Sequence, residues 1–423
     1  MLARTRALFA LTALVLIASC TGSADHAGVG ERSVTIGYLA PLSGPDAALG
    51  ESARHGAELA EEIVNEAIPS IDLPLSRGRG LPHLDGAGIR IRFADTAGDP
   101  DRGPAAVDHL VRDSHAKALV GAYQSAVTLT ASAHAEEMRV PFVNGDSSAA
   151  SLTERNLNWF FRTGPTDVTL GQMLFSLLKE KQNTGTATER IAVIHSDDRY
   201  GRDGDALISR LAAQSGRNVV RDVTIPVDST DLNAQVQQLQ SAQPDVVFAL
   251  AYTNSARRLI DALKSRGYDP PALLAFGAGF TDPKFVKTHG EAAAGLCSRA
   301  AWSPDLAQRV PTARAVFDRY RRRFNAPMDD VAARAFTAVM TVAQAIDKAA
   351  SAEPGRIRAA LATLQIPGRD TIMPWDGIRF DENHQNTGAR GTVEQLINGR
   401  YHVVYPNDVA KTSVRWPLKK ARE

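Results

Sequence analysis

The residues VNGDSSAASLTE, from Val143 to Glu154, could carry out chemistry, because an aspartate and two adjacent serines follow an apolar run that reads as a buried strand. A serine becomes a nucleophile when a neighbouring base takes its proton and a third group orients that base. No histidine of the chain stands in a recognisable partner motif, and a G-x-S-x-G turn would need glycine at Ala149. Serine hydrolysis is therefore a distant alternative, and we do not expect an enzyme.

A second hydroxyl occupies the corresponding place one strand earlier in the chain. Ser125 follows a short apolar strand and begins an amphipathic run, where we expect it to cap a helix; Ser147 and Ser148 follow the next strand. Open parallel sheets bind ligands at the carboxyl ends of their strands, and helix N-termini attract anions. These hydroxyls therefore predict a socket for a carboxylate or a similar polar head. Plain helix capping is the alternative for each serine, and both roles can hold together.

Short apolar runs alternate with amphipathic ones along the chain, which predicts strands and helices in turn. Such alternation is typical of parallel sheets covered by helices on both faces. After residue 308 come long helical patterns, and the last strands follow them, with a tight turn at Asn398-Gly399 that indicates a hairpin. Residues 69–88 show no periodicity and are predicted to form a surface loop. The predicted strands before residue 277 are 34–39, 89–94, 118–120, 141–143, 191–195, 219–225, 245–250 and 272–276.

The composition sets limits on the class of protein. The chain has 423 residues, enough for two domains, with 44% hydrophobic and 22% charged residues, as in soluble globular proteins. A formal net charge of +1 gives no global field to attract nucleic acid, so no nucleic-acid partner is expected. The basic residues between 409 and 423 read as a solvated tail.

The N-terminus is typical of an export signal. Arg4 and Arg6 precede an apolar run over residues 8–17 that is too short to span a bilayer, and small residues then lead to Cys20. This resembles a bacterial lipobox, in which the cysteine is acylated and becomes the mature N-terminus; an ordinary secretory signal is the alternative. We expect residues 1–20 to be the signal, residues 21–32 a tether, and the protein to be exported and anchored by lipid to the outer face of the bacterial cytoplasmic membrane.

No metal site or cofactor is expected from the motifs. Asp197, Asp198, Asp203 and Asp205 form an acidic cluster, but they lack the glutamate that closes an EF-hand loop. The chain has neither a C-x-x-C nor an H-E-x-x-H pattern. If Cys20 carries lipid, Cys297 has no cysteine partner, and it is predicted to be a small core residue.

Six stretches carry a resemblance to a known family. In order they are IGYLAPLSGPDAALG, LVGAYQSAVTLTAS, VPFVNGDSSAASLT, IAVIHSDDRYGRDG, PDVVFALAYTNSARRLI and WDGIRFDENHQNTG. In this order and spacing, from about Val34 to Pro406, the chain resembles type I periplasmic binding proteins of the Leu/Ile/Val-binding family. The resemblance implies an α/β fold of two doubly wound parallel-sheet lobes joined by three crossovers, with a ligand held in the cleft and hinge closure over it.

The resemblance also implies the domain bounds and the site. Lobe one is expected to comprise residues 33–158 and 277–370, and lobe two residues 159–276 and 371–408. Ser125 and Ser148 match the family's hydroxyl ligands for a carboxylate, and Tyr200 matches the aromatic that lobe two lays over the ligand. An aromatic on each side of the cleft could hold an apolar or cationic group. The expected ligand-binding residues are Tyr123, Gln124, Ser125, Ser147, Ser148, Tyr200, Tyr252 and Ser255.

One departure from the family concerns the charge at Ser255. Amino-acid binders of this family usually place a carboxylate near that position, where it pairs with the ligand's ammonium, and a buried ammonium without a counter-charge costs several kcal/mol. Either another acid substitutes, or the ligand is an amide, a urea-like compound or a carboxylic acid without an α-ammonium. The candidate acids are Asp146, Asp197, Asp198 and Asp282.

The expected function is that of a lipid-anchored solute-binding protein that delivers a small polar ligand to an ABC importer. The permease and ATPase would be separate chains. A sensor of the same fold, which reports the ligand to a signalling protein without transport, is the alternative.

Overall fold

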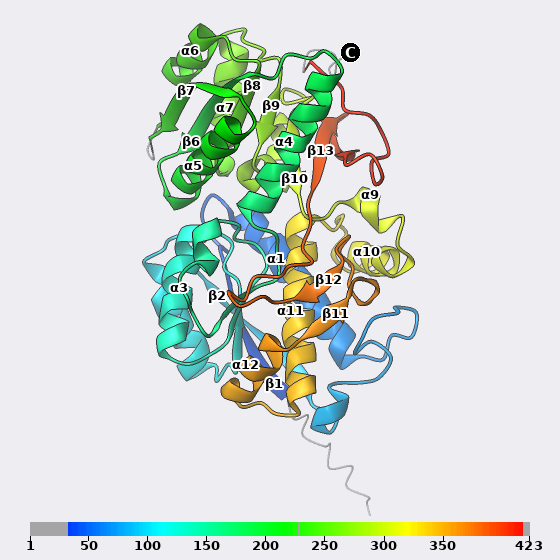
Figure 1. The fold of residues 1–423 in the computed structure, drawn as a ribbon. Helices are drawn as coiled ribbons and strands as arrows, with labels where there is room; N and C mark the ends of the chain where they lie inside the picture. The colour runs from blue at the N-terminus through cyan, green and yellow to red at the C-terminus, as the bar shows by residue number, and fades with distance from the viewer. Residues whose placement is uncertain (1–32, 227–228, 418–423) are drawn as a thin grey trace, which may run out of the picture. The chain divides into compact units, whose positions relative to one another are not determined.

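The computed structural model describes residues 33–226 and 229–417, and two large β-sheets in this part of the chain define two lobes (Figure 1). The sheet of lobe one has the order β2-β1-β3-β4-β5 and is parallel throughout. Its strands are β1 (Ser33–Ala40), β2 (Gly88–Asp95), β3 (Ala118–Val120), β4 (Phe142–Asn144) and β5 (Phe160–Arg162). The strands predicted in this region are confirmed.

Apolar side chains cover both faces of the lobe-one sheet. Ile36 and Val120 pack with α1 and α11, whereas Leu119 and Phe142 pack on the opposite face with α2 and α3. Strands buried on both faces need continuous apolar runs, which the sequence supplies, and full burial of each such side chain contributes about 1.5–3 kcal/mol. The helices of this lobe are α1 (Ala47–Asn65), α2 (Arg102–Asp108), α3 (Ser125–Glu137), α10 (Pro311–Phe324), α11 (Asp330–Ala349) and α12 (Pro354–Ala362).

The sheet of lobe two has the order β14-β13-β10-β9-β8-β6-β7. It is parallel from β10 to β7, and β13 runs antiparallel to both β10 and β14. Asn398 and Gly399 both have positive φ angles, of 51° and 70°, as a two-residue hairpin turn requires, so the predicted hairpin is confirmed. The strands are β6 (Arg190–Ser196), β7 (Asn218–Ile225), β8 (Val246–Leu250), β9 (Leu273–Ala275), β10 (Cys297–Ala300), β13 (Thr392–Ile397) and β14 (Arg400–Tyr405).

Helices also cover both faces of the lobe-two sheet. Val193 and Phe248 pack with α4 and α5, and Ile194 and Ala249 pack with α6 and α7 on the other face. The helices are α4 (Asp167–Asn183), α5 (Arg199–Gln214), α6 (Asn233–Ala242), α7 (Thr253–Ser265) and α8 (Pro283–His289). Two doubly wound α/β lobes, the predicted fold class, are therefore confirmed.

The chain crosses between the lobes three times, but later than the predicted bounds at residues 158, 276 and 370. β5 still belongs to the lobe-one sheet, β10 belongs to the lobe-two sheet, and Ile378 packs in the lobe-one core. Ile378 lies in β12 (Gly377–Arg379), which pairs with β11 (Gln365–Pro367). The crossovers therefore follow β5, β10 and β12. A strand's apolar pattern predicts its existence but not which sheet it joins, because both sheets bury the same kinds of side chain.

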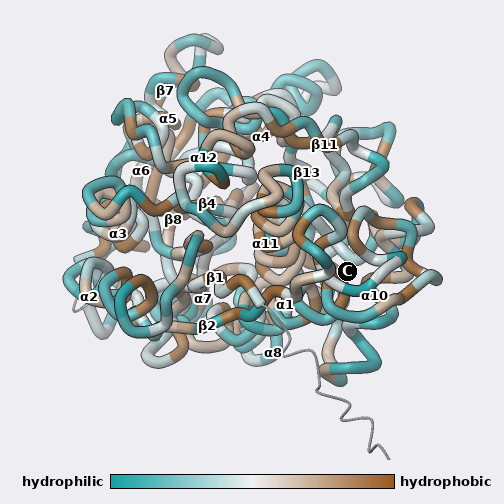
Figure 2. The backbone as a smooth tube through the Cα atoms, turned by 90° about the horizontal axis from the view of Figure 1, so that it is seen from below, coloured by the Kyte–Doolittle hydropathy of each residue, from teal (hydrophilic) through white to brown (hydrophobic). Residues whose placement is uncertain are grey.

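The predicted loop over residues 69–88 packs against lobe one instead of lying free on its surface. Leu73 and Leu81 are buried in the lobe-one core. His83 Nδ1 lies 2.7 Å from Asp347 Oδ2 near the end of α11. Figure 2 shows α11 mostly in the tan of hydrophobic residues. α1 and the 69–88 segment pack against this helix. Among the helices in the described ranges, none combines the length and apolarity that a membrane span needs.

Candidate ligand-binding site

The predicted serines lie together at the carboxyl ends of two neighbouring strands. β3 and β4 are paired in register, and Ser125, Ser147 and Ser148 follow them as buried residues. Helix α3 begins at Ser125, but the N-cap is Gln124, so the prediction that Ser125 caps the helix is wrong by one residue. The segment after Ser148 forms only a single 3₁₀ turn, Ala150–Thr153, whose N-cap is Ala149, so neither Ser147 nor Ser148 caps it.

Ser147 is held inside lobe one. Its Oγ lies 2.6 Å from Thr128 Oγ1 and 3.0 Å from each of the carbonyl oxygens of Ala122 and Tyr123. A hydroxyl and two carbonyls cannot act as the base that a nucleophilic serine needs. This geometry provides no catalytic arrangement at Ser147, and the contacts instead fix the loop after β4 against the start of α3.

Ser148 is joined to lobe two by an arginine that the sequence analysis missed. Arg299, on β10, donates from Nη2 to Ser148 Oγ at 2.8 Å and lies 3.2 Å from Asp167 Oδ1. Arg299 is only 5% exposed, and its Nε is buried without a hydrogen-bond partner among the described residues. A charged residue inside the otherwise apolar segment LCSRAAW was the available signal.

Local backbone geometry makes room for the guanidinium of Arg299. Gly277 has φ +74°, and a Cβ built there would lie 3.3 Å from Arg299 Cζ. The ring of Phe276 lies 5.9 Å from Arg299 Cζ, within reach of a cation–π contact. A side chain at position 277 would be strained and would also press on the guanidinium, so glycine is needed there.

The two predicted aromatic residues contact each other. The ring centroids of Tyr200 and Tyr252 lie 5.4 Å apart at 45°, and both residues belong to lobe two. Tyr200 donates its hydroxyl to the Phe276 carbonyl at 2.8 Å, and burial raises the pKa of this phenol. Tyr200 and Tyr252 therefore form one aromatic surface on lobe two, whereas the third predicted aromatic residue, Tyr123, belongs to lobe one.

Asp146 has an arginine partner from α11. Arg334 Nη1 lies 3.6 Å from Asp146 Oδ1 and donates to the Asp146 carbonyl oxygen at 2.7 Å, while Nη2 lies 2.8 Å from Asp330. Burial raises the pKa of Asp146 to about 7, against the opposing effect of Arg334. Arg334, like Arg299, was missed by the sequence analysis. Both are buried arginines close to the predicted serines.

Direct contact between the lobes is also made by Asp46, which the sequence analysis did not single out. Asp46, in the PLSGPDAALG stretch, accepts from Gln124 Nε2 at 2.8 Å within lobe one. Its other oxygen lies 2.9 Å from Thr253 Oγ1 at the start of α7 in lobe two. Ser255, two residues further along α7, is half-buried and takes no part in this contact. In α7, Thr253 and not Ser255 therefore contacts lobe one.

The remaining candidate acids have structural roles. Asp197 forms an exposed ion pair with Arg202 at 2.7 Å. Asp198 caps α5 by accepting from the amide of Gly201. Asp282 caps α8 and also lies 2.8 Å from Thr253 Oγ1. Of the candidate acids, Asp146 and Asp282 are buried and belong to polar networks with Arg334 and Thr253.

One group of side chains in the described ranges could hold a metal ion. His195, Asp205 and Asp222 place one ligand atom each within 4.8 Å of one another on lobe two. His195 Nε2 lies 3.3 Å from Asp222 Oδ1, and Nδ1 donates to the Ser196 carbonyl oxygen at 2.9 Å. The contact between the imidazole of His195 and the carboxylate of Asp222 accounts for this geometry without an ion. The group lies on β6, α5 and β7, apart from the serines.

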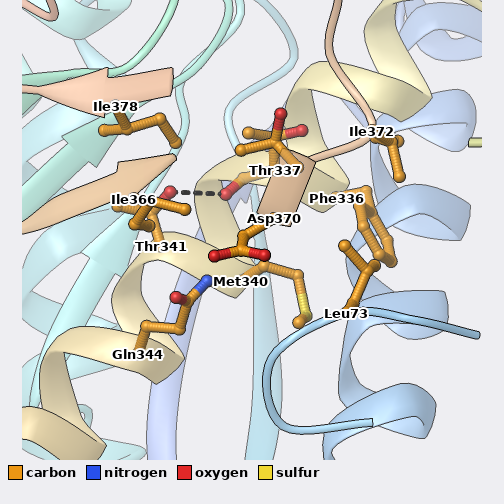
Figure 3. Close-up of a pocket in the computed structure, with 11 residues that line it drawn as sticks. Leu73, Phe336, Thr337, Met340, Thr341, Gln344, Ile366, Asp370, Ile372 and Ile378 are labelled. Carbon is orange, nitrogen blue, oxygen red and sulfur yellow. Dashed lines mark hydrogen bonds between the residues drawn. The ribbon is translucent and has the colours of Figure 1, made fainter. Parts of the chain in front are cut away.

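A small cavity in lobe one is too small to be the ligand site. It has a volume of about 10 Å³, enough for about one water molecule. Figure 3 shows Leu73 of the 69–88 segment facing Phe336 and Met340 of α11 across it, with Asp370 beside them. A larger open hollow of about 330 Å³ lies beside Phe93 and Arg102 at the edge of the lobe-one sheet.

Two doubly wound lobes with a buried polar network between them define a binding protein of the type I periplasmic class. The chain belongs to the periplasmic binding protein family, whose sequence model matches residues 33–395. A relative, the Leu/Ile/Val-binding protein homolog 7 of Brucella abortus (strain 2308), is 24% identical over 410 residues, covering 93% of this chain and 97% of the relative.

Solved structures share the fold. The branched-chain amino acid transporter substrate-binding protein LivJ of Streptococcus pneumoniae, in complex with isoleucine, is 22% identical with a TM-score of 0.72, covering 88% of this chain and all of that one. A solute-binding protein of an ABC transporter from R. palustris, in complex with benzoate, is 19% identical with a TM-score of 0.71, covering 88% of this chain and 95% of that one. This chain is thus a ligand-binding protein by family, not a member of an enzyme family.

Proposed function

We propose that the protein is the extracytoplasmic solute-binding component of an ABC importer and holds a small ligand with a carboxylate group between its lobes. The observation that carries the proposal is the contact between Arg299 of lobe two and Ser148 of lobe one, which puts a buried cation beside a predicted ligand hydroxyl. Relatives of the same family are named for Leu/Ile/Val binding, and structural neighbours contain isoleucine or benzoate.

The proposed carboxylate site combines groups from both lobes. Ser125, at the N-terminus of α3, and Ser148 supply hydroxyls from lobe one, and Arg299 supplies a guanidinium from lobe two. A carboxylate accepts bonds from both kinds of donor, and its bonds to a guanidinium are the stronger, charge-assisted ones. The proposed contacts for the body of the ligand are Tyr123, Tyr200 and Tyr252. Gln124 and Ser147 support this site from lobe one, and Ser255 lies at its margin.

Ligand identity is tested by a thermal-shift panel of amino acids, amides, ureas and aromatic and aliphatic carboxylates. Binding to the native state raises apparent stability, so at least one carboxylate should raise the melting temperature in a concentration-dependent way. Stabilisation by both an amino acid and its deaminated acid would show that no ammonium is needed. A panel in which only uncharged amides or ureas stabilise the protein would contradict the carboxylate site.

A transport role is distinguished from a sensing role by the partner. Transport requires a permease and an ATPase on separate chains, and ligand-loaded protein should stimulate ATP hydrolysis by a permease–ATPase complex encoded beside its gene. A neighbouring signalling kinase that responds to the loaded protein would favour the sensor. Hydrolysis of simple esters that disappears in Ser147→Ala would revive the enzyme alternative.

Anchoring by a lipid on Cys20 is part of the proposal, although Cys20 lies outside the described residues. Metabolic labelling with a fatty acid should tag the wild-type protein but not Cys20→Ala. Equal labelling of the two proteins would contradict lipidation at this cysteine and leave an ordinary secretory signal.

A further inference from the structure

The hydroxyl of Thr253 lies between two carboxylates. Its Oγ1 is 2.9 Å from Asp46 Oδ1 of lobe one and 2.8 Å from Asp282 Oδ2 of lobe two. A hydroxyl carries one hydrogen, and an ionised carboxylate can only accept. Thr253 can therefore donate to one of the two carboxylates, and the other short oxygen–oxygen contact lacks a proton if both acids are ionised.

The surroundings indicate which acid takes up the missing proton. Asp282 Oδ1 accepts from the amides of Lys284 at 2.6 Å and Phe285 at 3.3 Å, so its carboxylate already receives two donated hydrogens. Asp46 accepts from Gln124 and is also close to the Thr253 amide, but it is only 8% exposed. Burial raises the pKa of Asp46, and the nearby charge of Asp282 acts in the same direction.

One added proton satisfies every contact in this group. A protonated Asp46 donates to Thr253 Oγ1, and Thr253 donates to Asp282, so each short contact contains one hydrogen. The other titratable groups facing Asp46 are Tyr123 and Tyr252, both phenols with pKa values raised by burial and therefore neutral. No lysine or arginine forms an ion pair with Asp46 among the described residues.

We propose that closing lobe one onto lobe two binds one proton, shared along Asp46, Thr253 and Asp282, and that closure is therefore favoured as the pH falls. In an open form the carboxylate of Asp46 would face water and lose both the proton and the contact with Thr253. The proposal goes beyond the proposed function, since it concerns closure itself and holds for any ligand, although it rests on the lobes moving apart and together.

The sign of the effect follows from proton linkage. The closed form holds its proton up to a higher pH than the open form, for which the ordinary carboxyl pKa applies. Lowering the pH through the raised pKa therefore stabilises the closed form, and the gain is complete below the ordinary value. Raising the pH through the raised pKa removes this stabilisation of the closed form.

Closure is measured as the distance between spin labels at Ala105→Cys on α2 and Ala213→Cys on α5, both exposed, in the full chain carrying Cys20→Ala. The short-distance population of the otherwise wild-type protein should increase several-fold between about pH 8 and about pH 5. In Asp46→Asn the amide itself donates to Thr253, so this population should be high and independent of pH. Asp282→Asn supplies the missing hydrogen from the other side and should give the same result.

Two further variants serve as controls. Asp205→Asn removes a lobe-two carboxyl whose pKa is also raised by burial, but which makes no interlobe contact, and it should keep the wild-type pH dependence. Thr253→Ser keeps the hydroxyl and should also show the wild-type pH dependence of closure. The proposal is overturned if the wild-type distances do not change with pH, or if both Asn variants keep the wild-type dependence. Failure of the ligand panel would leave these distances unaffected, so the two proposals are tested separately.

Discussion

Arg299 Nη2 lies 2.8 Å from Ser148 Oγ, so a guanidinium of one lobe is hydrogen-bonded to a hydroxyl of the other. The pair is buried, and Asp167 shares the same guanidinium nitrogen. A cation at this place changes the interpretation of the serines. In the proposed site the serines supply one half, and the other half comes from a strand that lies 151 residues after Ser148 in the chain.

Arg299→Gln should weaken binding of any carboxylate found by the panel about 10- to 100-fold, because a hydrogen bond to a charged group contributes about 1.5–3 kcal/mol. Isothermal calorimetry measures the change. Arg221→Gln is the matched control, since Arg221 is exposed on β7, and it should bind as the wild type does. Equal affinities of the Arg299→Gln and wild-type proteins would place the carboxylate elsewhere.

Ser125→Ala should weaken the same ligand by about 1–3 kcal/mol if its hydroxyl bonds the charged group. The helix should persist, because Gln124 and not Ser125 is the N-cap. The comparison is with Ser132→Ala, another buried serine on α3, whose hydroxyl donates to the Thr128 carbonyl instead. If both variants bind equally well, Ser125 has only a packing role.

Asp146 should make the free energy of unfolding depend on pH. Its folded-state pKa of about 7 lies above the unfolded value of about 3.9, so the native state holds more protons between these values. The contribution of Asp146 to stability is therefore fully present below the unfolded value and is lost as the pH rises to about 7. The free energy of unfolding of Asp146→Asn, relative to that of the wild type, should therefore increase by roughly 1–3 kcal/mol when the pH is raised from about 5 to about 8.

Urea unfolding at the two pH values measures this difference. Asp95→Asn is the control, because hydrogen bonds from Ser43 and nearby amides lower the pKa of Asp95, and its titration lies below this range. The change in the free energy of unfolding caused by Asp95→Asn should be the same at both pH values. A constant difference between Asp146→Asn and wild type would mean that Asp146 stays ionised beside Arg334.

Cys297 should be unreactive in the folded protein. It is buried on β10 and burial raises the pKa of its thiol to about 12, so little thiolate forms near neutral pH. In the Cys20→Ala protein, alkylation by iodoacetamide at about pH 8 should be negligible until urea unfolds the chain. Rapid alkylation without urea would show that this strand opens locally.

The strand and helix pattern was readable because both sheets are buried on two faces and need continuous apolar runs such as Ile191–Ile194. The serines were found because a parallel sheet brings its strand ends to one edge. Arg299 and Arg334 were not singled out, since their partners Ser148 and Asp146 come from other elements. A lone arginine in an apolar segment does not reveal what it faces.

The sequence by itself determined the α/β class, the hairpin at Asn398-Gly399 and the position of Ser125, Ser147 and Ser148 after their strands, because these depend on local periodicity and turn chemistry. Only the tertiary structure decided which sheet β5 and β10 join and which acid meets Thr253. Such pairings join segments up to about 200 residues apart in the chain. They form where the side chains are buried and water no longer solvates their charges, and no local sequence pattern specifies them.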